Sequence, residues 1–281
     1  MTTGCIIQAR MTSSRLPGKV LKVIDFANQR TILEEVVGRV RQCASIDKVV
    51  VATTVNKDDD PIEELADKLG VACYRGSELD VLDRYYQAAR ENGLDRVLRI
   101  TSDCPFTDPL VLQGIIDLFD TGSYDYVSNA IERTFPHGLD CEMFSFAALE
   151  KAYTSTAFVE SDMFFREHVT TYLYGHPDLF ALGNYSMPDG RNYRDLRITV
   201  DTKEDYLLAC VLRSYLPDGF TYDDIIRVFE EKPFLSQINA TAVQKRKYET
   251  VRDEVEAAIS LLKLQEMNDA AGILSNYISE Q

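Results

Sequence analysis

The stretch Ile6-Ile-Gln-Ala-Arg-Met-Thr-Ser-Ser-Arg-Leu-Pro-Gly-Lys19 joins a short apolar run to a polar loop with three basic side chains. The apolar run, Cys5–Ile7, predicts a buried strand, and the prolyl-glycyl pair before the lysine predicts a turn. The loop carries Arg10, Arg15 and Lys19 together with several hydroxyl groups. Backbone amides, hydroxyls and cations on a loop after a first strand favour a polyanion, with a nucleoside triphosphate as the obvious candidate.

This loop is not a Walker A loop, although it ends in Gly18-Lys19. Val20 follows the lysine where that motif has Ser or Thr, and Ser13 stands in the place of its first glycine. Charge spacing alone leaves two interpretations open. The segment is either a phosphate-binding loop or a solvated basic loop after a core strand.

The pattern Gln-Ala-Arg-x-x-Ser-x-Arg-Leu-Pro-Gly-Lys over residues 8–19 resembles the signature loop of the cytidylyltransferases that activate acidic sugars as CMP-sugars. It is similar to the loops of CMP-Kdo synthetase and acylneuraminate cytidylyltransferase, and most similar to the branch named for spore-coat polysaccharide biosynthesis. The resemblance runs, with gaps, from residue 4 to about residue 233. It implies that three cations hold the phosphates of CTP and that two backbone positions lie near the base: Arg10, Arg15 and Lys19 for the phosphates, Gln8 and Ala9 for the base.

Length and composition predict a globular protein of one α/β core, alone or with an appendage. The chain has 281 residues, of which 45% are hydrophobic. It has no apolar run near 18 residues and no basic-plus-apolar leader, so we expect neither a membrane span nor a signal peptide. Its six cysteines never occur as Cys-x-x-Cys. We therefore expect reduced, buried thiols in a cytoplasmic protein, with neither a disulfide framework nor a zinc site.

The distribution of charge indicates a local anion site. The net charge of −15 argues against nucleic acid and against an anionic membrane surface. Residues 1–57 hold nine Lys and Arg against four Asp and Glu, a net of +5, which leaves −20 for the remainder. An acidic protein with its positive charge at one end does not suit an extended polyanion.

Apolar runs and helical patterns alternate along the chain. Strands are predicted at residues 5–7, 48–53, 71–74, 96–100, 124–127 and 196–200. Helices are predicted from Thr31, from Pro61 to Leu69, and at residues 81–90, 108–119, 144–153 and 204–216. This rhythm is typical of a doubly wound, mostly parallel α/β sheet. The resemblance implies the Rossmann-like fold of the nucleotide-diphospho-sugar transferases.

Three regions are expected. Residues 1–233 form the cytidylyltransferase domain, within which about 130–196 serve acceptor binding or a dimer arm. Residues 234–281 form a helical tail. Its apolar positions fall at helical spacing, on Tyr248, Val251, Val255, Ala258, Ile259 and Leu262, and then on Leu274, Tyr277 and Ile278. Such faces must pack on their own domain, on a second subunit or on another partner, and we expect a homodimer.

Two aspartates follow predicted strands. Asp103 lies after residues 96–100 and Asp201 after 196–200, at the sheet edge where ligands bind in open α/β folds. Two carboxylates opposite a phosphate loop suit Mg²⁺. Alternatively, each caps the helix that follows it. The family resemblance, carried by Ser-Asp-Cys-Pro and Ile-x-x-Asp-Thr-x-x-Asp, assigns both to the metal, with Asp205 as a weaker candidate for a supporting role.

The segment Tyr74–Tyr85 also resembles the family, whose members contact the pyrimidine and ribose there. The resemblance implies nucleotide-binding roles for Arg75, Gly76 and Ser77, and Ser102 is placed in the same set. We interpret Asp83 and Arg84 as structural residues that form ion pairs on the surface of the predicted helix.

The segment Phe135–Glu142 resembles the Pro-x-Gly-x-Asp-x-Glu pattern of the spore-coat branch. Asp140 and Glu142 alternate with apolar residues, so both are expected on one strand face, where they either recognise acceptor hydroxyl or amine groups or line an exposed edge. His168 either contacts the sugar or binds backbone or a carboxylate. The predicted acceptor set comprises Asn129, His137, Gly138, Asp140, Glu142, Glu167 and His168.

The sequence therefore predicts an Mg²⁺-dependent enzyme that transfers CMP from CTP to an acidic or amino sugar. A sugar hydroxyl attacks the α-phosphorus and pyrophosphate leaves, so the protein positions groups and stabilises charge. The predicted catalytic residues are Arg10, Arg15, Lys19 and Asp103. Three alternatives stay open: another base or acceptor, a non-catalytic nucleotide-sugar binding module, and a scaffold in which the tail is functional.

Overall fold

The computed structural model describes residues 1–156, 163–242, 251–264 and 267–279. The chain divides into two units, Met1–Ala242 and Val243–Gln281. The first unit extends past Pro233 because α10 (Leu235–Ile238) packs against α8 (Lys203–Tyr215) and buries Leu235.

A seven-stranded sheet in the order β5-β4-β1-β6-β8-β7-β9 forms the centre of the first unit. Neighbouring strands from β5 to β6 are parallel, β8 runs antiparallel to both of its neighbours, and β9 is parallel to β7. The predicted mostly parallel α/β sheet is therefore confirmed. The strands are β1 (Thr3–Gln8), β4 (Lys48–Thr54), β5 (Ala72–Gly76), β6 (Arg96–Thr101), β7 (Tyr126–Ser128), β8 (Glu142–Ser145) and β9 (Leu182–Asn184).

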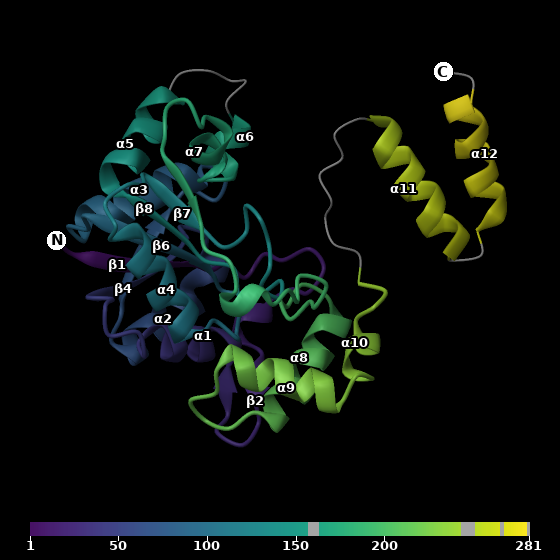
Figure 1. The fold of residues 1–281 in the computed structure, drawn as a ribbon, viewed down its shortest axis with the longest axis horizontal. Helices are drawn as coiled ribbons and strands as arrows, with labels where there is room; N and C mark the ends of the chain where they lie inside the picture. Colours follow the sequence, from purple (N-terminus) through teal and green to yellow (C-terminus); the bar gives the residue numbers. More distant parts are fainter. Residues whose placement is uncertain (157–162, 243–250, 265–266, 280–281) are drawn as a thin grey trace. The chain divides into compact units, whose positions relative to one another are not determined.

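Helices cover both faces of the sheet (Figure 1). Side chains alternate along β1, so that Cys5 and Ile7 join one buried cluster and Ile6 joins the other. The first cluster takes its helical residues from α1 (Ile32–Val40), α2 (Asp60–Leu69), α4 (Pro109–Phe119), α8, α9 (Tyr222–Glu231) and α10. The second takes them from α3 (Val81–Glu91), α5 (Phe146–Ser155) and α7 (Thr171–Gly175).

Capping residues set several helix ends where the sequence signals predict them. Thr31 and Glu34 form a capping box at the start of α1, which satisfies two backbone amides. Asp108 caps α4 ahead of Pro109. Gly70 closes α2 in the left-handed conformation, with φ 62°.

The predicted strand at residues 196–200 is wrong. The segment makes one isolated bridge, between Arg197 and His137, and Ile198 and Val200 are buried in the core. Gly138, at φ +117°, turns the chain directly after the bridge, so no ladder continues. Burial, not pairing, explains the apolar pattern.

One other expectation changes. Residues 144–145 continue β8, and α5 begins only at Phe146, because Ser145 extends the ladder and caps the helix. The region 130–196, predicted to serve acceptor binding or a dimer arm, contains α6 (Met163–Glu167), α7 and the short strand β9 among its described residues. A small antiparallel hairpin of β2 (Val23–Asp25) and β3 (Arg30–Thr31) lies apart from the main sheet.

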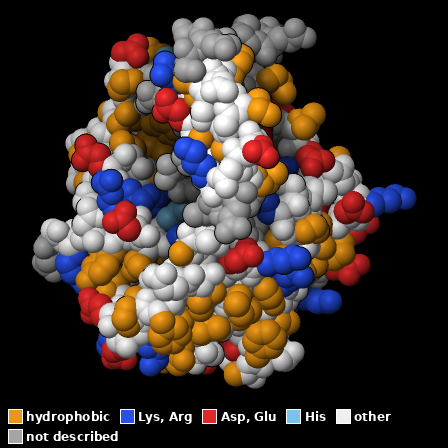
Figure 2. All heavy atoms as spheres, turned by 90° about the vertical axis from the view of Figure 1, so that its right-hand side faces the viewer, with side chains coloured by type: hydrophobic (Ala, Val, Ile, Leu, Met, Phe, Trp, Pro, Cys, Tyr) orange, Lys and Arg blue, Asp and Glu red, His pale blue; other side chains and the backbone are white. Residues whose placement is uncertain are grey.

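The second unit contains α11 (Val251–Leu264) and α12 (Asn268–Ser279), which pack against each other. Ile259 and Ala271 are buried, whereas Ile273 is largely exposed. Tyr248 lies outside the described residues. None of the described helices is long and apolar enough to cross a bilayer. Figure 2 shows hydrophobic side chains in patches between charged ones on one face of the protein.

Candidate active site

Lys19 lies between the two aspartates predicted to bind metal. Its Nζ is 2.9 Å from Asp103 Oδ2 and 3.0 Å from Asp201 Oδ1, and it also donates to the carbonyl of Val200 at 2.8 Å. Burial opposes the charge on Lys19, but the two carboxylates outweigh burial and raise its pKa. We call Lys19, Asp103, Asp201 and their direct ion-pair partners the Lys19 cluster.

Two arginines complete the cluster around Asp201. Its Oδ2 is 3.1 Å from Arg15 Nη2 and 2.9 Å from Arg197 Nη2. Burial would raise the pKa of Asp201, but Lys19, Arg15 and Arg197 lower it to about 2. Arg197 was missed in the sequence, although it stands four residues before Asp201 within the same motif.

Neither metal candidate is a helix cap, so that alternative is wrong for both. Asp108 caps α4, where its carboxylate accepts from two backbone amides. Thr202 caps α8 in a capping box with Asp205. The buried Asp205 carboxylate also accepts from Arg197 at 2.8 and 3.0 Å, so it holds Arg197 in place behind Asp201.

The converging carboxylates fit a magnesium ion. Oxygens of Asp103 and Asp201 lie within 3.0 Å of one nitrogen, and their side chains keep 25% and 20% exposure. Mg²⁺ uses one or two protein carboxylates and completes its shell with water and phosphate oxygens. Within the described ranges no group of three or more His, Cys, Asp or Glu side chains could hold a metal ion.

The basic loop borders a cavity of about 730 Å³. Thr12, Ser13 and Gly18 line it from the loop, and Lys57 lines it from the opposite side. The buried carboxylate of Asp59 accepts from the Met11 amide at 2.7 Å and from the Thr54 amide, so it fixes the loop to the end of β4. Asp59 gave no recognisable signal in the sequence.

Arg10 lies outside the Lys19 cluster. Its Nη1 is 3.7 Å from Glu78 Oε1, which also accepts from Thr12 Oγ1 at 2.9 Å. The other oxygen of Glu78 accepts from Asn56 at 2.7 Å. Glu78 therefore joins the basic loop to the loop after β4, a role that no sequence pattern indicated.

The backbone predicted to lie near the base is already bonded within the sheet. The Gln8 carbonyl accepts from the Ser102 amide at 2.9 Å, and the Ala9 amide donates to Ala52 at 3.1 Å. The side-chain Oε1 of Gln8 is buried and has no hydrogen-bond partner. The Gln8 side chain therefore carries a buried acceptor without a partner at the end of β1.

Arg75 and Arg84 occupy different positions from those expected. Arg75 Nη1 pairs at 2.7 Å with Asp60 and with Glu63, so it fastens β5 to α2. Arg84 is 1% exposed and donates to the Ser77 carbonyl at 2.8 Å, and burial lowers its pKa. The interpretation of Arg84 as a surface ion pair is therefore wrong. Gly76 lies directly against it, since an added Cβ would lie 3.1 Å from Arg84 Cγ.

Each of the two predicted acceptor acids has an arginine partner. Both carboxylate oxygens of Asp140 accept from Arg133, whereas Glu142 Oε1 accepts from Arg99 Nη1 at 2.5 Å. The two acids therefore belong to two separate networks, and Asp140 precedes β8 whereas Glu142 begins it.

Other acceptor candidates hold the local structure together. The Asn129 side chain is buried and bonds to Leu139 and Cys141. His137 Nδ1 lies 3.1 Å from Arg197 Nη1, and burial lowers the pKa of His137. Gly138 packs so closely that an added Cβ would be 2.6 Å from the Thr199 nitrogen.

Comparisons with known proteins agree with this arrangement. Residues 4–253 match the family model described as Cytidylyltransferase.

The chain belongs to the cytidylyltransferase family.

Spore coat polysaccharide biosynthesis protein SpsF of Bacillus subtilis is 37% identical over 207 residues, 72% of this cytidylyltransferase and 82% of its own chain. A 3-deoxy-manno-octulosonate cytidylyltransferase of Nitratidesulfovibrio vulgaris is 37% identical over 123 residues, 42% and 46% of the two chains. A solved cytidylyltransferase structure from Leptospira borgpetersenii has 34% identity and a TM-score of 0.77, over 88% of this chain and 100% of that one.

The remaining acceptor candidates of the cytidylyltransferase lie at the end of α6. Glu167 is exposed, and the His168 ring packs on Phe164 with ring centroids 4.8 Å apart. All six cysteines are free; four are buried as predicted, whereas Cys73 and Cys210 are partly exposed. Burial raises the pKa of each thiol.

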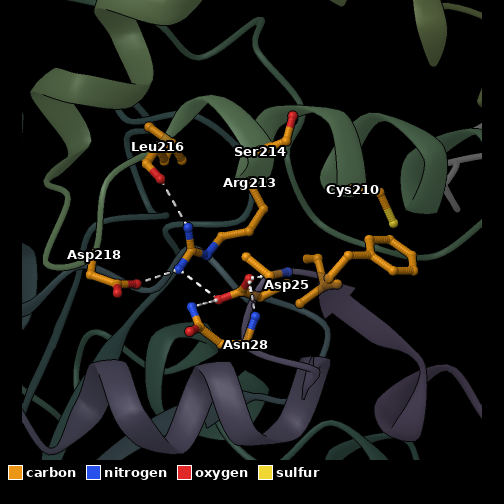
Figure 3. A pocket seen from close by; sticks show the side chains of 10 residues that line it. Asp25, Asn28, Cys210, Arg213, Ser214, Leu216 and Asp218 are labelled. Carbon is orange, nitrogen blue, oxygen red and sulfur yellow. Dashed lines mark hydrogen bonds and ion pairs between the residues drawn. The ribbon is translucent and has the colours of Figure 1, made fainter.

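A second ionic network lies between the β2–β3 hairpin and α8. Figure 3 shows the Arg213 side chain directed toward Asp25 and Asp218, beside a cavity of about 300 Å³. Arg213 Nη2 is 2.9 Å from Asp25 and 2.7 Å from Asp218, and Nε is 3.3 Å from Glu35. We call this set, together with Arg30, the Asp25 network.

Proposed function

We propose that this cytidylyltransferase transfers the cytidylyl group of CTP to a sugar hydroxyl and releases pyrophosphate, for surface polysaccharide or glycoconjugate synthesis. The observation that carries the proposal is the convergence of Asp103, Asp201 and Lys19 beside a basic loop at the carboxyl edge of the sheet. The names of the spore-coat and octulosonate relatives support a sugar acceptor.

In this reaction the sugar oxygen forms a bond to the α-phosphorus, and the bond between the α-phosphorus and the bridging oxygen to the β-phosphate breaks. The hydroxyl proton is lost, and the negative charge leaves with pyrophosphate. Mg²⁺ held by Asp103 and Asp201 would supply charge neutralisation and a more acidic hydroxyl. Lys19 and Arg15 would bind phosphate oxygens and stabilise the leaving pyrophosphate.

Arg197 would keep Asp201 in place during the reaction. It is fixed by two hydrogen bonds to Asp205, so it does not need to reorganise when phosphate arrives. This chemistry requires no covalent nucleophile, because positioning and charge stabilisation provide the rate enhancement.

Pyrophosphate release tests the proposal. CTP, UTP, GTP and ATP are each incubated with Mg²⁺ and a panel of acidic, amino and neutral sugars, with EDTA as the control. We expect release that requires CTP, one class of sugar and the metal together. Pyrophosphate release with UTP, GTP or ATP but not with CTP, or release that does not depend on the sugar, would contradict the proposal.

We also propose that the enzyme acts in the cytoplasm as a homodimer. The free cysteines fit a reducing compartment, and the exposed side chains of Met267 before α12 and Ile273 within it leave apolar surface on the second unit. Truncation after Ala242 should then convert the dimer to a monomer, as measured by light scattering, while turnover persists. A truncated enzyme that is still dimeric would exclude a dimer made through the tail.

A further inference from the structure

The ammonium group of Lys19 uses its whole hydrogen-bonding capacity inside the protein. A lysine ammonium carries three N–H donors and no acceptor. Nζ donates to Asp103 Oδ2 at 2.9 Å, to the Val200 carbonyl at 2.8 Å and to Asp201 Oδ1 at 3.0 Å. Since all three donors are used, Lys19 can bind a phosphate oxygen only if it gives up at least one of these acceptors.

The same ammonium group lies where the two carboxylates would hold a metal ion. Oxygens of Asp103 and Asp201 converge on Nζ within 3.0 Å. A divalent cation at these two oxygens, with the ammonium group still in place, would bring two positive charges together, which is unfavourable in a partly buried site. Lys19 and a metal ion therefore exclude each other from the two carboxylates.

Departure of Lys19 would free one oxygen of each carboxylate and leave Asp201 held. Asp201 gives Oδ1 to Lys19, whereas its Oδ2 is 3.1 Å from Arg15 Nη2 and 2.9 Å from Arg197 Nη2. Asp205 in turn holds Arg197 through two hydrogen bonds. Because Oδ2 stays bonded, the freed Oδ1 stays directed toward the other freed carboxylate.

Only the side chain of Lys19 has to move. The loop backbone is held at Met11, whose amide donates to Asp59 at 2.7 Å and whose carbonyl accepts from the Gly18 amide at 3.0 Å. Lys19 begins the short 3-10 helix η1 (Lys19–Leu21) directly after that glycine. Its flexible four-carbon stem can carry the ammonium group from one acceptor to another while the backbone keeps its position.

A metal ion alone finds few ligands at the two carboxylates. In the part of the chain that the structure describes, no group of three or more His, Cys, Asp or Glu side chains could hold an ion. Mg²⁺ completes its shell with water and phosphate oxygens. A triphosphate would supply such oxygens and would also offer the Lys19 ammonium new acceptors. The nucleotide therefore removes the competing cation and adds metal ligands together.

We propose that Lys19 is an exchangeable counter-ion, which keeps divalent cations off Asp103 and Asp201 until a nucleoside triphosphate draws its ammonium group away. This rests on the proposed function and names the regulation of its metal site. Metal and nucleotide then bind with positive coupling, and each raises the affinity for the other by the same factor. Without nucleotide, the cluster holds an ammonium group in place of a metal ion.

Binding of Mn²⁺, used as a paramagnetic substitute for Mg²⁺, tests the proposal without turnover. Free Mn²⁺ is measured from its electron paramagnetic resonance signal while the ion is titrated into the full chain without nucleotide. Lys19→Met removes the charge at similar length and should bind Mn²⁺ at least about tenfold more tightly than wild type. Adding Asp103→Asn to Lys19→Met should abolish this gain, because one of the two carboxylates is lost.

Two control variants separate this effect from a general change in charge. Lys19→Arg keeps a cation between the carboxylates and should bind Mn²⁺ as weakly as wild type. The same result is expected for Lys22→Met, which removes a nearby charge from outside the Lys19 cluster. If Lys19→Met does not fold, Lys19→Gln takes its place, since its neutral amide can still donate to one carboxylate.

The thermal midpoint of unfolding is the second readout. Mn²⁺ alone should raise the midpoint of Lys19→Met, whereas wild type should respond to Mn²⁺ only when CTP is present. Equal Mn²⁺ affinity of wild type and the neutral Lys19 variants would overturn the proposal, and so would a gain that survives Asp103→Asn.

Failure of the proposed function gives a different pattern from failure of the Lys19 exchange. If no combination of nucleotide and sugar gives pyrophosphate release, the transfer reaction is not supported. A gain in Mn²⁺ affinity in Lys19→Met that depends on Asp103 would still uphold the exchange. Release of pyrophosphate without that gain would uphold the reaction and overturn the exchange.

Discussion

The Lys19 cluster and the Asp25 network use the same kinds of side chain but differ in burial and place. The side chains of Lys19, Asp103 and Asp201 keep 10%, 25% and 20% exposure. Those of Asp25 and Arg213 keep 4% and 6%. The cluster lies at the carboxyl edge of the parallel strands, whereas the network lies between a hairpin and α8.

This difference separates an exchangeable site from a structural one. In the Lys19 cluster, we expect the partly exposed ion pairs to open and exchange carboxylates for phosphate oxygens. In the Asp25 network, removal of one partner leaves another charge buried without compensation. The place of a charged cluster in the fold and its access to water therefore indicate a reactive site better than its residue types do.

The largest effect is expected from Asp103→Asn and Asp201→Asn. Each replaces a charge by an amide of nearly equal volume and should lower kcat about a thousandfold, about 4 kcal/mol at the barrier. Circular dichroism should show an intact fold, and Asp95→Asn before β6 is the control. Retention of more than about a tenth of the wild-type rate would exclude the residue as a principal metal ligand.

Arg213→Met should act on stability instead. It removes the buried one of the two arginines that Asp25 and Glu35 share, leaves Arg30 alone with them, and should lower the free energy of unfolding by about 3 kcal/mol. Urea titration measures the loss, with kcat of the folded enzyme expected to be unchanged. Arg227→Met, which breaks an exposed pair with Asp224, should cost less than about 1 kcal/mol. A fall in kcat at constant stability would place the Asp25 network in catalysis.

Acid should weaken both regions. The pKa of Asp25 and that of Asp201 are each lowered from 3.8 to about 2, so each carboxylate stabilises the fold above pH 3.8. That contribution, about 2 kcal/mol each, is lost as the pH falls through about 2. Unfolding free energies measured between pH 5 and 2 should fall less steeply in Asp25→Asn and in Asp201→Asn. If the unfolding free energy of a variant fell with pH as steeply as that of wild type, the lowered pKa of that aspartate would be contradicted.

The smallest effect distinguishes two neighbouring lysines. Lys19→Ala should raise the KM for CTP about tenfold, about 1.4 kcal/mol, because a partly buried cation leaves the phosphate site. Lys22 lies over the Tyr206 ring, and Lys22→Ala should leave the KM for CTP nearly unchanged. Steady-state kinetics with CTP as the varied substrate compares them. Equal effects would indicate a diffuse basic surface without an ordered loop.

The sequence predicted those features that depend on local patterns. Strand β4 follows from a valine-rich run, and α1 and α2 follow from their caps and apolar spacing. The approach of Lys19 to Asp103 follows from their places after β1 and β6, because parallel strands deliver their carboxyl ends to one edge. Asp201 reaches the same place from a buried segment that is not a strand.

Features set by distant partners could not be predicted. Asp59 meets Met11 across 48 residues, and nothing local distinguishes it from its acidic neighbours. Arg75 matches a family motif, yet two acids of α2 engage it. The apolar run before Asp201 looks like a strand because burial and pairing leave the same hydrophobic pattern.

The close contact at Gly138 joins two segments that are far apart in the sequence. An added Cβ would lie 2.6 Å from the Thr199 nitrogen, so any larger residue at position 138 would push the segment after Phe135 away from the segment before Asp201. His137 meets Arg197, and Arg197 holds Asp201. A substitution at Gly138 should therefore move the Asp201 carboxylate, although Gly138 itself has no polar side chain.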